Sequence, residues 1–153
     1  MRSNILSAII VLAITASFGG AGAQDAGKKV ISTPNAPEAI GPYSQAIQAG
    51  KTVYVAGQIA IDPKTKQLMT NGSIEGQTRL VLENIAAVLA AAGLTLDHVV
   101  STTVFLKDMN EFPKMNDVYG TFFKNAPPAR ATVEVARLPR DAKVEISAIA
   151  VQP

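Results

Sequence analysis

The most regular hydrophobic pattern in the chain is helical and covers residues 73–92. Its apolar or small side chains recur at alternating intervals of four and three residues, which places them on one helix face: Ile74, Thr78, Val81, Ile85, Val88 and Ala92. Glu75 lies in the first turn, where the helix dipole favours a carboxylate, and Gly93 is well placed to end the helix. The pattern therefore predicts one long amphipathic helix.

A shorter helix is predicted after Asn110, whose side chain can cap it. Pro113 is tolerated because it falls in the first turn, where its missing N–H has no helical partner to lose. The bulky side chains of this segment share a face at helical spacing: Phe112, Met115, Tyr119 and Phe122. We expect Tyr119 here, and Tyr54 in a predicted strand, to belong to the hydrophobic core.

Two short runs, residues 45–49 and 52–59, flank a Gly-Lys turn and predict a β-hairpin. Alternation along the second run places Gly57 on the same face as Val53 and Val55. The first strand of this hairpin follows a Gly-Pro turn, which restricts how the chain departs from it.

Three further segments have the composition of strands. Residues 99–106 are β-branched and aromatic and predict a single strand. Residues 131–138 and 144–151 alternate in polarity and predict a second hairpin that turns at residues 139–141. Residues 30–31 could form a short edge strand.

The resulting order, β-β-α-β-α-β-β, predicts an α+β domain with one mixed sheet and both helices on one face. The other face of the sheet then needs a cover, and the chain has no third helix to supply it. Alternating valine, alanine and isoleucine residues in the last strands favour a second copy of the chain as that cover. We therefore expect a dimer or a trimer.

The first 23 residues have the pattern of a secretory signal peptide. Arg2 supplies a positive charge, residues 5–18 are uncharged and largely apolar, and Ala21-Gly22-Ala23 fits a cleavage site. The alternative is an uncleaved membrane anchor, although the apolar run is shorter than the roughly 20 residues that span a bilayer. We expect residues 1–23 to be removed and residues 24–153 to form the mature domain, periplasmic or secreted and free of the membrane.

Composition narrows the possible chemistry. The 153 residues allow one domain, and the absence of cysteine excludes disulfides, a thiol nucleophile and Cys-ligated metals. The single histidine, His98, excludes a multi-histidine metal site and is expected to be a solvated side chain before a strand. Without Arg2 the mature domain has 13 basic and 12 acidic residues, net +1, so charge gives no indication of nucleic-acid binding.

Three polar residues lie where a structural role alone does not require them. Arg130 follows Pro127-Pro128-Ala129, a stiff approach that would fix a guanidinium for bidentate binding of a carboxylate or phosphate. Glu145 lies inside an apolar run, where desolvation would raise its pKa and suit it to proton transfer. Tyr43 follows the Gly-Pro turn. Each residue alone could equally be an exposed charge, a salt-bridge partner or a packed aromatic.

Together these residues belong to five segments that resemble the RidA (YjgF) family. The segments are NAPEAIGPYSQA at 35–46, VAGQI at 55–59, TTVFLKDMN at 102–110, PARATVEVARLP at 128–139 and VEISAIAV at 144–151. The resemblance covers about residues 30–151. It implies a chorismate-mutase-like α+β fold, a homotrimer with clefts between subunits, and hydrolysis of 2-imino (enamine) acids to 2-oxo acids and ammonia. It implies no cofactor and no metal.

The resemblance also assigns roles by position. Arg130 would clamp the substrate carboxylate, and Glu145 would orient or activate the attacking water. Tyr43, Gly57 and Asn116 would line the substrate cleft.

One position departs from the family pattern. Thr132 stands two residues after Arg130, where many members carry cysteine. The deamination reaction does not depend on that cysteine, so Thr132 is still expected to line the substrate site. Without that cysteine, a chaperone or redox role that depends on a thiol is not expected.

Two other functions compete with deamination. An endoribonuclease or RNA-binding role, which some members of the family have been assigned, has little support from a net charge of +1 and few aromatic residues. A module that binds a small ligand without turnover would use the same clefts.

The predicted closing hairpin also bears on where the site forms. It would place residue 130 opposite about residue 150, five positions from Glu145, or roughly 17 Å at 3.4 Å per residue. A small imino acid cannot bridge that span, so we expect Arg130 and Glu145 of one site to come from different subunits.

Overall fold

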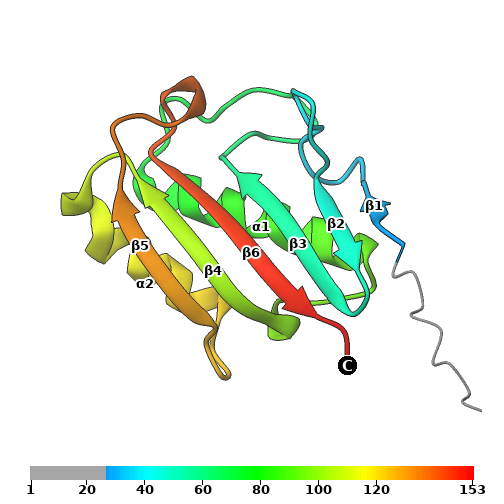
Figure 1. Cartoon of the computed structure of the whole chain (residues 1–153). Coiled ribbons are helices and arrows are strands. Elements are labelled where there is room, and N and C mark those ends of the chain that lie inside the picture. Colours follow the sequence, from blue (N-terminus) through cyan, green and yellow to red (C-terminus); the bar gives the residue numbers. More distant parts are fainter. Residues whose placement is uncertain (1–26) are drawn as a thin grey trace, which may run out of the picture.

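The computed structural model describes residues 27–153, so the predicted signal peptide at 1–23 lies outside the described residues. Six strands form one sheet: β1 (Lys29–Ile31), β2 (Ala46–Ala49), β3 (Thr52–Gln58), β4 (Val99–Leu106), β5 (Ala129–Glu134) and β6 (Val144–Val151). Two helices, α1 (Ile74–Ala91) and α2 (Phe112–Phe122), complete the fold (Figure 1). The strand order is β1-β2-β3-β6-β4-β5, with β4 and β5 parallel and every other pair antiparallel.

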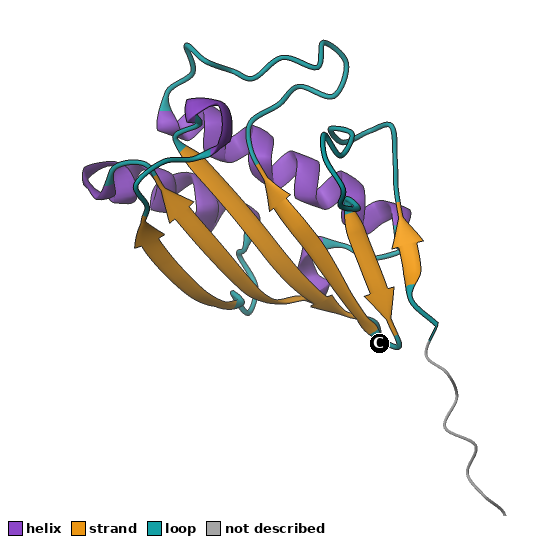
Figure 2. Ribbon diagram, turned by 45° about the horizontal axis from the view of Figure 1, so that its top comes forward, coloured by secondary structure: helices purple, strands orange, loops and turns teal. Residues whose placement is uncertain are grey.

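Both helices cover the same face of the sheet, which we call the helix face, and leave the other face open (Figures 1 and 2). The core lies between these layers. The helix α1 contributes Val81, Leu82, Ile85, Val88 and Leu89 to it, and β6 contributes Val144, Ile146, Ala148 and Ala150. The predicted α+β architecture, with one mixed sheet and two helices on one face, is confirmed.

The helix α1 forms where the hydrophobic period predicts it. Ser73 caps it, because its side-chain oxygen accepts a hydrogen bond from the N–H of Gly76 at 3.2 Å. Gly93 follows the helix with φ of 75°, a left-handed conformation that favours glycine and ends the helix. No helix within residues 27–153 has the length and apolar character that a membrane crossing requires.

The second helix begins later than predicted. Asn110 does not cap it, because this residue lies in a short 3₁₀ turn at Met109–Glu111 that Asp108 caps. The helix α2 starts at Phe112, directly after that turn, with Pro113 in its first turn. An aspartate and an asparagine two residues apart can each cap a helical turn, so local sequence alone does not separate the two.

The predicted closing hairpin is wrong. The strands β5 and β6 do not pair; β6 lies in the middle of the sheet between β3 and β4, while β5 lies at the edge beside β4. The strand β5 also ends at Glu134, four residues before the predicted end. Because alternate residues of β6 are fully buried, this apolar strand gains most from a central position, and alternation alone does not reveal which partner a strand takes.

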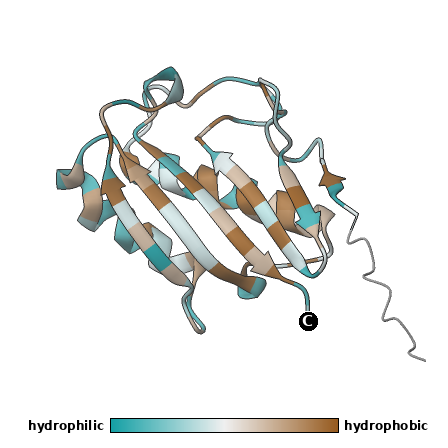
Figure 3. Cartoon of the chain, viewed as in Figure 1, coloured by the Kyte–Doolittle hydropathy of each residue, from teal (hydrophilic) through white to brown (hydrophobic). Residues whose placement is uncertain are grey.

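Apolar residues recur along the strands of the sheet (Figure 3), and some of them are exposed on its open face. Tyr54 is 50% exposed and Val133 44% exposed, and Val30 and Val151 are exposed as well. The prediction that Tyr54 belongs to the core is wrong for the isolated chain, because its neighbours Val53 and Val55 take the helix face. This exposed apolar surface agrees with the expectation that another copy of the chain covers the open face.

Candidate active site

A cavity of about 370 Å³ opens at one end of the sheet and contains three of the six predicted site residues: Tyr43, Gly57 and Glu145. Tyr43 comes from the segment before β2, Gly57 from the end of β3 and Glu145 from the start of β6. The apolar part of the wall consists of Pro37, Ile40, Ile59, Ile61 and Pro139. Two carboxyl groups line the cavity as well: Glu145, and Glu38, which is exposed and paired with Lys66 at 3.1 Å.

Glu145 lies on the open face, because its neighbours Val144 and Ile146 are buried against the helices. The side chain is half-buried, and burial raises the pKa of its carboxyl above the usual value for glutamate. A carboxyl group in these surroundings exchanges protons closer to neutral pH than an exposed one does, which suits it to general acid–base chemistry.

Gly57 leaves the space that the Glu145 side chain occupies. A β-bulge sets Ala56 and Gly57 of β3 against the single residue Ser147 of β6. A Cβ atom on Gly57 would meet the Glu145 carboxylate, with its Cδ atom at 2.8 Å. The bulge thus turns Gly57 toward Glu145, and the prediction that Gly57 shares a face with the buried Val55 is wrong because alternation breaks there.

We expect the substitution Gly57→Ala to displace the Glu145 carboxylate and to lower turnover by at least about tenfold, because a misplaced catalytic group loses its alignment. The fold should persist, since the atoms displaced belong to the end of a flexible side chain. Gly76→Ala, in the first turn of α1, is the matched control because its Cβ would make only ordinary contacts, at 3.4 Å and beyond. Full activity in Gly57→Ala, with an unchanged melting temperature, would contradict this reading of the bulge.

A buried glutamine holds the wall of the cavity in place. The side chain of Gln45 accepts a hydrogen bond from the N–H of Thr33 at 2.7 Å. Its amide group donates to the carbonyl groups of Thr33, Ala36 and Pro37, the last at 2.6 Å. These bonds tie the segment before β2 to the sheet edge. The sequence gives no signal for this role, because only the folded chain brings the 33–37 carbonyl groups around one amide.

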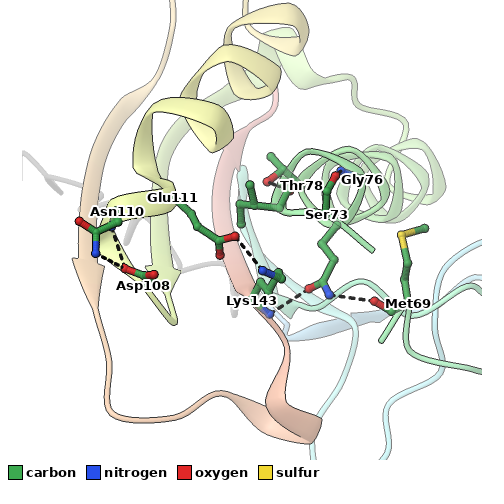
Figure 4. Close-up of polar contacts among 10 residues, drawn as sticks. Met69, Ser73, Gly76, Thr78, Asp108, Asn110, Glu111 and Lys143 are labelled. Atoms are coloured by element: carbon green, nitrogen blue, oxygen red, sulfur yellow. Dashed lines mark hydrogen bonds and ion pairs between the residues drawn. The ribbon is translucent and has the colours of Figure 1, made fainter. Parts of the chain in front are cut away.

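A second glutamine fixes the start of the strand that carries Glu145. The buried Gln77 donates to the Met69 carbonyl at 2.8 Å and accepts from the Lys143 N–H at 2.9 Å. The Lys143 ammonium in turn contacts the Glu111 carboxylate at 2.7 Å (Figure 4). The polar contacts around α1 therefore place the first residues of β6.

The other three predicted residues lie on the helix face, near α2. The Arg130 guanidinium donates to the side-chain oxygen of Asn116 at 2.8 Å. Its Cζ atom lies 4.5 Å from the centre of the Tyr119 ring and 5.6 Å from that of Phe112. The Thr132 hydroxyl is buried without a hydrogen-bond partner among the described residues. Within residues 27–153, Arg130 therefore keeps N–H donors without a partner on the helix face, and the buried Thr132 hydroxyl lacks a partner too.

One chain does not bring the two groups of residues together. Arg130 pairs with Thr102 and Thr102 with Ala148, both buried on the helix face, whereas Glu145 pairs with Phe105. Arg130 and Glu145 therefore point to opposite faces, and their Cα atoms lie roughly 14 Å apart, from two strand spacings and three residues along the strands. The expected separation of roughly 17 Å rests on a hairpin that the structure does not contain. The register of the sheet nevertheless keeps Arg130 and Glu145 of one chain apart.

The single histidine of the sequence, His98, has a local structural contact. Its Nδ1 atom lies 3.1 Å from the Thr95 N–H and 3.0 Å from the Thr95 hydroxyl, at the short turn before β4. Within residues 27–153, no three side chains of His, Cys, Asp or Glu gather as they would around a metal ion.

Comparisons with known proteins identify relatives across the whole described domain. The profile of the endoribonuclease L-PSP family matches residues 33–152. A RutC family protein of Pyrococcus horikoshii is 58% identical over 123 residues, 80% of this chain and 97% of that protein. The 2-iminobutanoate/2-iminopropanoate deaminase of Mus musculus is 50% identical over 125 residues, 82% of this chain and 92% of that protein. The crystal structure of the YjgF gene product of E. coli has a TM-score of 0.78 and 46% identity, and covers 82% of this chain and 99% of its own.

Proposed function

Because the chain belongs to the endoribonuclease L-PSP family, which includes the RidA (YjgF) proteins, we propose that it hydrolyses 2-imino acids to 2-oxo acids and ammonia. Some of its close relatives are imine deaminases, and others carry only the RutC family name. The observation that carries the proposal is a pair of half-sites: a fixed guanidinium on the helix face and a partly buried carboxyl in a cavity on the open face.

The guanidinium half-site suits the substrate carboxylate. Among residues 27–153 Arg130 donates one hydrogen bond, to Asn116, and its other N–H groups can bind a carboxylate through two parallel hydrogen bonds. The buried Thr132 hydroxyl lies two residues along the same strand and face and can donate a further bond. These contacts fix the imino acid by its carboxylate and leave C2, the electrophilic carbon, exposed to water.

The carboxyl half-site suits the water that attacks C2. Glu145 takes a proton from the water as its oxygen bonds to C2, which gives a tetrahedral carbinolamine. Glu145 returns that proton to the imine nitrogen and then carries the proton of the new C2 hydroxyl to the same nitrogen, so the C–N bond breaks and ammonia leaves as C2 becomes a carbonyl. Water is consumed and ammonia released, so atoms balance and no electrons are transferred. Most of the rate gain comes from holding C2, the water and Glu145 in line.

We propose that two subunits complete each site, within a homotrimer. The support is the register of the sheet, which points Arg130 and Glu145 of one chain to opposite faces, and the apolar open face that another copy would cover. One subunit would supply Arg130, Asn116 and Thr132, and its neighbour Tyr43, Gly57 and Glu145.

The experiment generates imines in the assay cuvette from several amino acids with an amino-acid oxidase and measures the rate of 2-oxo acid formation. The proposal predicts a rate well above spontaneous hydrolysis. A chain that binds 2-oxo acids but leaves the spontaneous rate unchanged would be a binding module instead. Salt-dependent retention or cleavage of RNA, with no effect on imines, would favour the endoribonuclease role that the family description names.

We also propose that the domain works outside the cytoplasm after loss of residues 1–23. The support is the sequence pattern alone: one basic residue, an apolar run and a small-residue cleavage site. N-terminal sequencing of protein from its natural host should begin at or near Gln24. An intact Met1 on soluble cytoplasmic protein would contradict the proposal.

A further inference from the structure

The Arg130 guanidinium lies along one face of α2, and three residues of that face contact it. Phe112, Asn116 and Tyr119 follow one another at intervals of four and three residues, so their side chains form a row on the helix. Asn116 accepts one hydrogen bond from the guanidinium, and the two rings lie 5.6 Å and 4.5 Å from its carbon. Both distances are within the range of favourable cation–π contacts.

The Tyr119 ring is itself held rigidly. It is only 5% exposed, its hydroxyl lies 2.7 Å from the buried Thr102 hydroxyl, and its ring centre lies 4.6 Å from that of Phe123. Thr102 is also the residue that pairs with Arg130 across β4 and β5. Thr102 therefore fixes both the backbone that carries Arg130 and the Tyr119 ring that lies beneath its guanidinium.

A free arginine side chain loses considerable rotamer entropy when it binds an anion. An arginine that already rests on a fixed ring has lost that freedom in folding, so a larger part of its interaction with the ligand appears as affinity. The rings offer no hydrogen-bond acceptor in their faces, so they hold the cation without taking up its remaining N–H donors.

We propose that Tyr119 and Phe112 are positioning residues for Arg130, holding its guanidinium so that the N–H groups not bonded to Asn116 face the substrate carboxylate. This inference rests on the proposed function and deepens it. It assigns part of the affinity for carboxylates to two aromatic side chains that do not touch the substrate, and it separates the role of the Tyr119 ring from that of its hydroxyl.

The test measures the dissociation constant of 2-oxobutanoate, a stable 2-oxo acid, by calorimetry on the full chain, together with KM and kcat for an imine. Tyr119→Leu removes the ring, and we expect about tenfold weaker binding and a similar rise in KM with kcat within about twofold. Tyr119→Phe keeps the ring and loses the bond to Thr102; we expect near-normal binding. Phe122→Leu is the matched control, because the ring of this α2 residue lies against Arg79 and outside the group formed by Arg130, Tyr119 and Phe123.

Three results would overturn the inference. They are unchanged binding in Tyr119→Leu, equal weakening in Phe122→Leu, and weakening in Tyr119→Phe as large as in Tyr119→Leu, which would assign the effect to the hydroxyl. If Tyr119→Leu does not fold, Phe112→Leu replaces it, because that ring is only partly buried; about twofold weaker binding is expected, and unchanged binding would overturn the inference. Because 2-oxobutanoate binding needs no turnover, a wild-type chain that binds it but leaves imines untouched would refute the proposed function and not this inference.

Discussion

Replacing Arg130 with alanine should lower kcat/KM for imine hydrolysis by at least about 100-fold, the largest effect expected of any single substitution in the chain. The guanidinium is the only group in either half-site with a permanent positive charge. Without it the substrate carboxylate loses its charge-assisted hydrogen bonds and C2 is no longer held in line with the water. The fold should persist, because the side chain lies on the surface of α2 and not within the core.

Arg79→Ala is the matched control for this substitution. Arg79 is a second arginine whose guanidinium lies over an aromatic ring of α2, in its case 6.0 Å from the centre of Phe122. It belongs to α1 and to neither half-site. We expect Arg79→Ala to keep normal turnover. Near-normal turnover in Arg130→Ala would refute the assignment of the carboxylate clamp.

Replacing Glu145 with glutamine should lower kcat by about 100-fold with little change in KM, since the amide keeps the shape but cannot accept a proton from water. When substrate is bound, its carboxylate neutralises the positive charge of the Arg130 guanidinium. The fall of kcat at acid pH should therefore follow the protonation of the desolvated Glu145 carboxyl. Burial raises the pKa of Glu145, so that fall should lie above the ordinary glutamate value of 4.5. Unchanged kcat in Glu145→Gln would remove Glu145 from the proton transfer.

Although Glu145→Gln should lower activity, it should raise the stability of the fold at neutral pH. A carboxyl whose pKa is raised by folding contributes stability below its unfolded pKa and loses that contribution as pH rises through its folded pKa. Glutamine stays neutral at every pH. The melting temperature of Glu145→Gln should therefore exceed that of the wild-type chain at pH 7, and the difference should vanish near pH 4.

The sequence predicts well which segments form helices and which form strands, because the hydrophobic patterns that indicate them are local. The period of α1 and the alternation of β6 each follow from residues close together in the chain. The partner of a strand does not follow from residues close together in the chain. The sequences of β5 and β6 are typical of a hairpin, yet β6 inserts between β3 and β4. Strand pairing depends on which faces the other elements bury.

The site residues divide in the same way. Arg130, Glu145 and Tyr43 stand out in the sequence because a stiff approach, an apolar run and a turn surround them. Gln45 does not stand out, because its role is to bind carbonyl groups that only folding assembles. Tyr119 has the spacing of a core residue and is one; its contact with Arg130 is visible only when β5 lies beside α2.

The central claim is that Arg130 and Glu145 of one working site come from different chains. It is tested by mixing Arg130→Ala and Glu145→Gln proteins after dissociation and reassembly, with mixed trimers verified by mass spectrometry. Random assembly should restore about one quarter of wild-type activity, because one pairing in four joins an intact Arg130 to an intact Glu145. No recovery in verified mixed trimers would place both residues of each site in the same chain and contradict the account.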